Sequence, residues 1–103
     1  MLCVMRREEA LKILERLGPA LQSYGVTDIA LFGSVARDAA TADSDVDILI
    51  DFVADGETFD NFLAVVELLE SNFSLPVDAV TRNGLGVHVA PYVEREAVHA
   101  KIA

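Results

Sequence analysis

The strongest constraint on the fold is an apolar segment that carries aspartates inside it. Residues 46–52, VDILIDF, combine branched apolar side chains with acids and predict a strand. Alternation along a strand gives this segment two faces, with Val46, Ile48 and Ile50 on one and Asp45, Asp47, Leu49 and Asp51 on the other. A half-buried strand tolerates so many carboxylates only where they meet solvent or where a positive charge neutralises them. The segment therefore predicts either a solvated strand or a site for a cation.

The periodicity of apolar residues predicts the other elements around this strand. The helices are expected at residues 8–23 with a break at Gly18-Pro19, and at 35–39, 59–73 and 91–101; further strands are expected at 29–32 and 75–81. This order indicates an α/β sandwich with few strands, and 103 residues suit one domain, residues 1–103. Ser34 is expected to cap the short helix.

The helices are also expected to supply part of the core. The buried stripe of the helix at 59–73 is expected to consist of Phe59, Phe62, Leu63, Val66 and Leu69. From the last helix, Val93, Ala97 and Val98 are expected to face inward.

The composition excludes several classes of function. Eight Lys and Arg stand against 17 Asp and Glu, a formal net charge of −9, so nucleic acid is not expected as the main partner. No apolar stretch is long enough to cross a membrane. Cys3 is the only cysteine, which excludes an internal disulfide and a cysteine-rich zinc site and indicates a cytoplasmic protein.

A second strand carries another acid, Asp78, between Val77 and Ala79. If the two strands are neighbours, Asp45, Asp47 and Asp78 converge and repel one another unless a cation lies between them. Mg²⁺ prefers carboxylate and phosphate oxygens, and acids on two strands suit a two-metal site for phosphoryl or nucleotidyl displacement. The alternative is that these aspartates are ordinary loop and surface residues.

Gly33-Ser34 lies where a strand is expected to pass into a helix. Glycine allows the backbone to approach a phosphate closely, and a hydroxyl next to free helical amides suits an anion. The pair is weak evidence alone, but the Asp-x-Asp pattern that follows it makes a specific combination.

This combination has a known counterpart. The segment GSVARDAATADSDVDILI resembles the signature of the DNA polymerase β-like nucleotidyltransferases, which is Gly-Ser, a spacer and Asp-x-Asp. The short chain, the stretches SDVD and PVDAVT and the closing YVEREAVHA are similar to the minimal nucleotidyltransferases of that superfamily. The resemblance covers almost the whole chain. Asp38 and Ala79 depart from it, because relatives commonly have Gly and Leu at these positions.

The resemblance implies a mixed sheet packed with helices, and a reaction that uses Mg²⁺, as two ions, and ATP. It implies that Asp45 and Asp47 hold the metals and that Asp78 completes the metal site and helps to deprotonate an acceptor hydroxyl. It also implies a set of nucleotide contacts: Gly33, Ser34, Arg37 and Ser44.

The resemblance further implies a partner, because many members are antitoxins encoded beside a HEPN-domain ribonuclease toxin and are thought to transfer AMP to one of its tyrosines. Two alternatives stay open: an antitoxin that acts by binding alone, and a catalytic subunit of a small-molecule nucleotidyltransferase. A homo-oligomer is compatible with either.

The remaining charged residues allow less specific expectations. Arg37 is compatible with a triphosphate contact and with pairing to Asp38, Asp43 or a helix end, and its position in the motif slightly favours the triphosphate. Asp51 is expected to be an acid at a strand end or sheet edge. Arg82, just past the strand that carries Asp78, is expected to be a solvated surface residue, with contact to a nucleotide or a partner as the alternative. His88 and His99 lack the spacing of metal ligands and are expected to have structural or surface roles.

Overall fold

The computed structural model describes residues 5–102, so Cys3 lies outside the described part. Helices and strands follow one another in the order α1 (Arg7–Arg16), α2 (Gly18–Ser23), β1 (Val26–Phe32), α3 (Gly33–Ala36), β2 (Val46–Phe52), α4 (Phe59–Asn72), β3 (Val77–Thr81), a 3₁₀ turn η1 (Arg82–Gly84), α5 (Ala90–Glu96) and β4 (Val98–His99). The α/β class predicted from the sequence is therefore confirmed.

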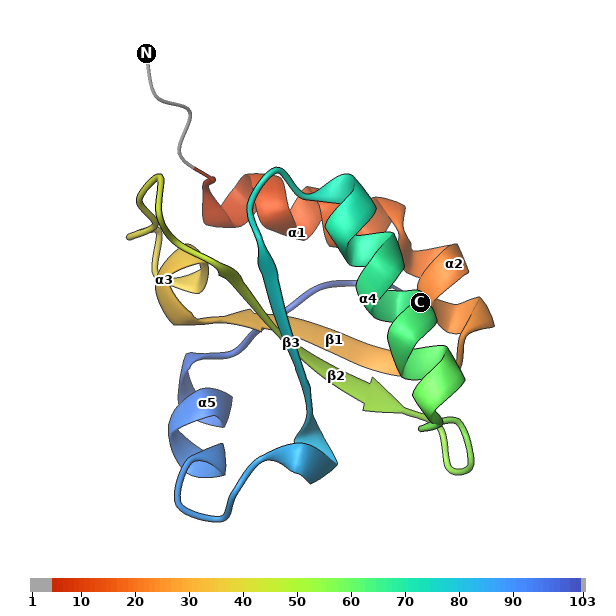
Figure 1. Ribbon diagram of the computed structural model, residues 1–103. Coiled ribbons are helices and arrows are strands. Elements are labelled where there is room, and N and C mark those ends of the chain that lie inside the picture. Colours follow the sequence, from red (N-terminus) through yellow and green to blue (C-terminus); the bar gives the residue numbers. More distant parts are fainter. Residues whose placement is uncertain (1–4, 103) are drawn as a thin grey trace.

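The strands form one mixed sheet in the order β3-β2-β1-β4. β1 pairs antiparallel with β2 and with β4, whereas β2 and β3 are parallel. The aspartate-bearing strand β2 thus lies inside the sheet, between β1 and β3. Helices cover both faces, with α1, α2 and α4 on one and α5 on the other (Figure 1).

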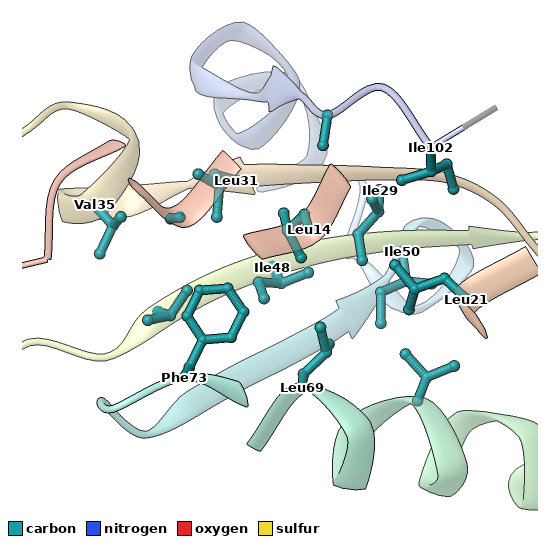
Figure 2. Close-up of a cluster of buried hydrophobic side chains, with 14 of the residues drawn as sticks. Leu14, Leu21, Ile29, Leu31, Val35, Ile48, Ile50, Leu69, Phe73 and Ile102 are labelled. Carbon is teal, nitrogen blue, oxygen red and sulfur yellow. The ribbon is translucent and has the colours of Figure 1, made fainter. Parts of the chain in front are cut away.

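The two faces of β2 carry the side chains that strand alternation predicts. Ile48 and Ile50 are fully buried in the main core, with Leu14 from α1 and Leu69 from α4 (Figure 2). Leu49 points to the opposite face, where it packs in a smaller apolar cluster under α5. Burial of large aliphatic side chains on both faces, each worth about 1.5–3 kcal/mol, fixes the register of this strand and so the direction of its acids.

The break at Gly18 is confirmed, and the packing explains it. α1 ends at Arg16 and α2 begins at Gly18 with Pro19 in its first turn. A Cβ atom on Gly18 would lie 2.8 Å from the carbonyl oxygen of Ile102, so only glycine allows the C-terminal segment to pass this close.

Other boundaries differ from those predicted. β1 begins at Val26 rather than at residue 29, and β3 begins at Val77 rather than at residue 75. α3 begins at Gly33, with Phe32 in the cap position, so Ser34 lies within the helix and the expectation that it caps the helix is wrong.

The predicted buried stripe of α4 is also wrong in part. Phe59 is 79% exposed and Leu63 43% exposed, whereas Val65 and Leu69 are fully buried. Apolar residues occupy more than one side of this helix, so periodicity alone did not show which side meets the sheet. Thr58 caps the helix by accepting a hydrogen bond from Asn61 N at 3.1 Å.

The predicted C-terminal helix at 91–101 is shorter in the structure. α5 ends at Glu96, and Val98–His99 form β4, although Val93 is buried as expected. On the side away from β2, the N–H and C=O groups of β1 need hydrogen-bond partners, and a longer C-terminal helix would leave them without any. β4 supplies such partners by pairing Val98 with Leu31, and Ala100 N then donates to Ile29 O at 3.0 Å. Within residues 5–102, no helix has the length and apolar character needed to cross a membrane.

Candidate functional site

Two of the predicted acids are neighbours across the sheet. The parallel pairing of β2 and β3 places Asp47 opposite Asp78, and the two carboxyl groups lie close enough for their negative charges to repel. Asp47 is partly buried, whereas Asp78 and Asp45 are exposed. The expected convergence of the acids of two strands is therefore present for Asp47 and Asp78, whereas Asp45 lies in the loop immediately before β2.

This crowding changes the acidity of Asp47. Burial, followed by the negative charges of Asp78 and then Asp45, raises the pKa of Asp47 from 3.8 to about 6, while Arg37 acts in the opposite direction. Asp47 therefore keeps its proton to a higher pH than a free aspartate does, and its ionised form, which dominates at pH 7, is held against the repulsion of the neighbouring acids. A cation or a hydrogen-bond donor at this point would relieve the repulsion.

Gly33 lies directly against this acid pair. Phe32, the last residue of β1, pairs with Asp47, and the chain then turns into α3 at Gly33 with φ +73°. A Cβ atom on Gly33 would lie 2.1 Å from Oδ2 of Asp47. The position needs glycine both for its backbone conformation and for the space that the carboxylate occupies.

Arg37 does not pair with Asp38 or Asp43, the two ion-pair partners considered from the sequence. Its Nη1 donates to Oε1 of Glu96 at 2.7 Å, and Gly33 N donates to Oε2 of the same carboxylate at 3.4 Å. Sequence reasoning missed Glu96 because that reasoning placed it inside a longer helix. The signal that could have identified it is its position just before a short apolar segment that can pair with β1.

Asp38 points toward α1. Its φ is +57°, a conformation that favours glycine and that aspartate tolerates, and its Oδ1 accepts a hydrogen bond from Arg7 N at 2.6 Å. The carboxylate thus caps the start of α1. This contact directs the negative charge of Asp38 toward α1 and so explains how an acid is tolerated at residue 38, close in sequence to Gly33 and Arg37.

The two serines differ in their surroundings. Ser34 lies in α3 next to Gly33 and is partly buried. The hydroxyl of Ser44 accepts a hydrogen bond from Thr41 N at 2.8 Å and so closes the loop before Asp45. Ser44 therefore shapes the approach to β2 in this conformation.

The expectation that Arg82 is solvated is wrong. Its Nε contacts both carboxylate oxygens of Asp51, at 3.0 and 2.9 Å, and its Nη1 binds Glu94 of α5. Asp51 stands near the end of β2 but inside the sheet, not at its edge. These ion pairs connect β2 to α5 through Arg82. They explain the presence of Asp51, which pairs with this arginine rather than with the acids around Asp47.

The two histidines have the surface positions expected for them. His99 Nδ1 lies 2.8 Å from Oδ2 of Asp28, and both side chains are exposed. His88 is exposed in the loop before α5.

Comparison with known proteins identifies the family. A family model described as a nucleotidyltransferase domain matches residues 7–103. A protein adenylyltransferase, MntA, of Thermococcus cleftensis is 40% identical over 78 residues, which are 76% of this chain and 78% of the relative. A solved structure, assigned provisionally as a minimal nucleotidyltransferase, superposes with a TM-score of 0.70 at 34% identity and covers 85% of this chain and 93% of that one. The chain belongs to the minimal nucleotidyltransferase family.

Two further proteins are similar to the chain. A relative from Methanocaldococcus jannaschii, named provisionally as a protein adenylyltransferase, is 40% identical over 73 residues, 70% of each chain. A solved structure from Sulfolobus solfataricus shares the fold with a TM-score of 0.51 at 20% identity. The resemblance stated from the sequence motifs, including the mixed sheet it implied, is confirmed, and the protein is a nucleotidyltransferase.

A divalent cation is the group that such a family implies, and the donor set suits it in part. Asp47 and Asp78 offer hard carboxylate oxygens side by side, and their mutual repulsion would fall when a cation binds. Within residues 5–102, however, no three acidic, histidine or cysteine side chains gather into a group that could hold a metal ion. A cation bound here would therefore complete its coordination with water or phosphate oxygens, as Mg²⁺ commonly does.

Proposed function

We propose that this nucleotidyltransferase transfers AMP from ATP, with Mg²⁺, to a tyrosine hydroxyl of a partner HEPN-domain toxin and so acts as its antitoxin. The observation that carries the proposal is the contact between Asp47 and Asp78, with the backbone of Gly33 against Asp47. Two carboxylates beside a glycine turn suit a metal-bound triphosphate. The relatives named as protein adenylyltransferases support AMP as the group transferred and a protein as the acceptor.

In this proposal each residue has a defined task. Asp47 and Asp78 would hold Mg²⁺ together with phosphate oxygens or water, and Asp45, just before β2, would add a further carboxylate once metal is bound. One or two bound ions would neutralise charge on the phosphates. The Gly33 amide and the Arg37 guanidinium would bind phosphate oxygens, with Ser34 next to them. Ser44 would contribute by holding the loop that presents Asp45, given its bond to Thr41.

The chemistry is an in-line displacement. The tyrosine oxygen attacks the α-phosphorus of ATP, a new P–O bond forms, and the bond to the leaving pyrophosphate breaks. The phenolic proton passes to Asp78, whose exposed position allows an acceptor from another molecule to reach it. Asp47, deeper in the site, would remain against Gly33 and orient the nucleotide.

A protein acceptor fits the surface next to this face of the sheet. α5 covers the face that carries Leu49 and Asp47, and the loop before α5 together with its first turn exposes Val87, Val89 and Tyr92. Exposed aromatic and aliphatic side chains of this kind favour contact with a protein over contact with a small polar substrate. The formal net charge of −9 opposes a nucleic acid as acceptor.

The experiment is incubation with ATP, Mg²⁺ and the product of the neighbouring gene, which this proposal expects to be a HEPN-domain protein, followed by intact-mass measurement of that product. We expect its mass to rise by one or more AMP units and a tyrosine to carry the modification. Reactions without Mg²⁺ and with an Asp78→Ala variant serve as controls. An unchanged mass of the partner, with the enzyme folded and ATP present, would contradict the proposal.

A further inference from the structure

The Glu96 carboxylate contacts both groups that the proposed function assigns to phosphate. One oxygen accepts from Arg37 Nη1 at 2.7 Å and the other accepts from Gly33 N at 3.4 Å. A guanidinium and a backbone amide that converge on a carboxylate are equally suited to a phosphate, which offers the same kind of acceptor oxygens. In this conformation the chain thus satisfies these two donors with an anion of its own.

The register of the sheet puts Glu96 in this position. β4 pairs His99 with Ala30 and Val98 with Leu31. Continuing this antiparallel register by two residues brings Glu96 opposite Gly33. On the other side of Glu96, Val93 anchors α5 against the apolar cluster of β1 and β2. The backbone at Glu96 is therefore held from both directions while its side chain reaches the glycine turn.

The contact is suited to exchange. The side chain of Arg37 is 54% exposed and that of Glu96 is 38% exposed, so water screens their attraction and an ion pair of this kind is weak. A multiply charged phosphate is a stronger partner for a guanidinium than a single carboxylate is. Glu96 can turn toward solvent without opening the apolar contacts of α5.

We propose that Glu96 is an internal competitor of the nucleotide, whose carboxylate takes the place of a phosphate group in the free enzyme and is displaced when a triphosphate binds. The inference rests on the proposed function, because that function places the triphosphate at Gly33 and Arg37. Glu96 lowers the affinity for the triphosphate by occupying its donors. It lowers the affinity for the pyrophosphate product in the same way, and so favours product release.

The chain contains a matched control for this inference. Glu94 lies on the same helix two residues earlier, and it pairs with Arg82 rather than with Arg37. Arg82 keeps Asp51 as a partner when Glu94 is changed. Glu94→Gln therefore removes the same charge from the same helix and leaves the contacts of Gly33 and Arg37 intact.

The test is calorimetric titration of the wild type, Glu96→Gln and Glu94→Gln with inorganic tripolyphosphate and with MgATP. We expect Glu96→Gln to bind both ligands about three- to tenfold more tightly than the wild type, and Glu94→Gln to differ from it by less than about twofold. Equal or weaker binding by Glu96→Gln would overturn the inference, and weaker binding would indicate that Glu96 positions Arg37. Equal tightening in both variants would also overturn it, because the cause would then be net charge.

A second measurement does not depend on affinity. In the wild type, tripolyphosphate should shift the NMR resonances of both the Gly33 amide and the Glu96 side chain, because one anion replaces the other. A Glu96 side chain that stays unperturbed while the Gly33 amide shifts would overturn the displacement. AMP transfer to the partner is measured separately, so a failure of the proposed function is distinguished from a failure of this inference.

Discussion

Gly33 and Asp47 are so close that a Cβ atom on the glycine would lie 2.1 Å from a carboxylate oxygen of the aspartate. The two residues come from different strands, and the pairing of Phe32 with Asp47 brings them together. A side chain at residue 33 would therefore displace the carboxylate of Asp47.

Gly33→Ala should disturb this arrangement. The new methyl group would push Asp47 away from Asp78, and the positive φ of Gly33 is unfavourable for alanine, so we expect a loss of about 1 kcal/mol in the free energy of unfolding and a large loss of transfer activity. Chemical denaturation and the intact-mass assay measure the two effects. Gly86→Ala is the matched control, because nothing lies within 4 Å of a Cβ atom there. Equal effects of the two substitutions would contradict this interpretation.

The acidity of Asp47 leads to a prediction about pH. The raised pKa means that the folded protein binds more protons at Asp47 than the unfolded chain does between pH 3.8 and about 6. The contribution of Asp47 to stability therefore falls as pH rises through this window and is least favourable above it. In the absence of metal, Asp47→Asn should stabilise the protein at pH 7 by about 1 kcal/mol, a value reduced for solvent screening, and should leave it unchanged near pH 3.5.

Thermal denaturation across this pH range, with a chelator present, measures that effect. Asp43→Asn in the exposed loop before β2 is the control and should shift stability little at any pH. A clear loss of stability in Asp47→Asn at pH 7 would show that the ionised carboxylate has a favourable partner.

Metal and nucleotide should bind together. Asp47 and Asp78 supply only part of a coordination shell, and phosphate oxygens supply the rest, so ATP should bind at least about tenfold more tightly with Mg²⁺ than without it. Calorimetry with and without a chelator measures the difference. In Asp47→Asn the advantage of Mg²⁺ should largely disappear. The same affinity for ATP in both conditions would argue against a carboxylate-bound cation.

Asp78→Ala separates an enzyme from an antitoxin that acts by binding alone. Asp78 is exposed on β3, so its removal should leave the fold and the affinity for the partner nearly unchanged. Transfer should fall by about a thousandfold or more, because the base and a metal ligand are both lost. Mass spectrometry, partner affinity and toxin neutralisation are measured together, with Asp43→Ala as the control. A variant that adds no AMP and still neutralises the toxin fully would favour inhibition by binding.

Much of the site was predictable because it depends on short-range patterns. Alternation in β2 predicted which side chains of this strand share a face, and it placed Asp47 near Asp78 on the condition that their strands are neighbours, which they are. The Gly-Ser and Asp-x-Asp motifs marked Gly33 and Asp47 as parts of one site, and the structure brings these two residues together. Such inferences need only the period of a strand and the position of a turn.

The parts that were missed depend on pairing between distant segments. Glu96 meets Gly33 only because β4 takes the free edge of β1, and Arg82 finds Asp51 and Glu94 only because α5 lies across the sheet. Residues 97–101 are compatible with a helix as an isolated sequence. Hydrogen bonding to the unpaired edge of β1 favours a strand instead. The local sequence of residues 97–101 does not show that this edge is free.

The shortness of β4 means that the two sides of the site have different local stabilities. β2 is paired on both sides from Asp47 to Ile50, whereas β4 has two residues and is followed by one further backbone bond, from Ala100 to Ile29. Local opening costs least where few hydrogen bonds and little apolar contact must be broken. In deuterated solvent the amide of Ala100 should therefore exchange well before those of Ile48 and Ile50. The segment that carries Glu96 can fray and close again while the aspartates remain in their places on the sheet.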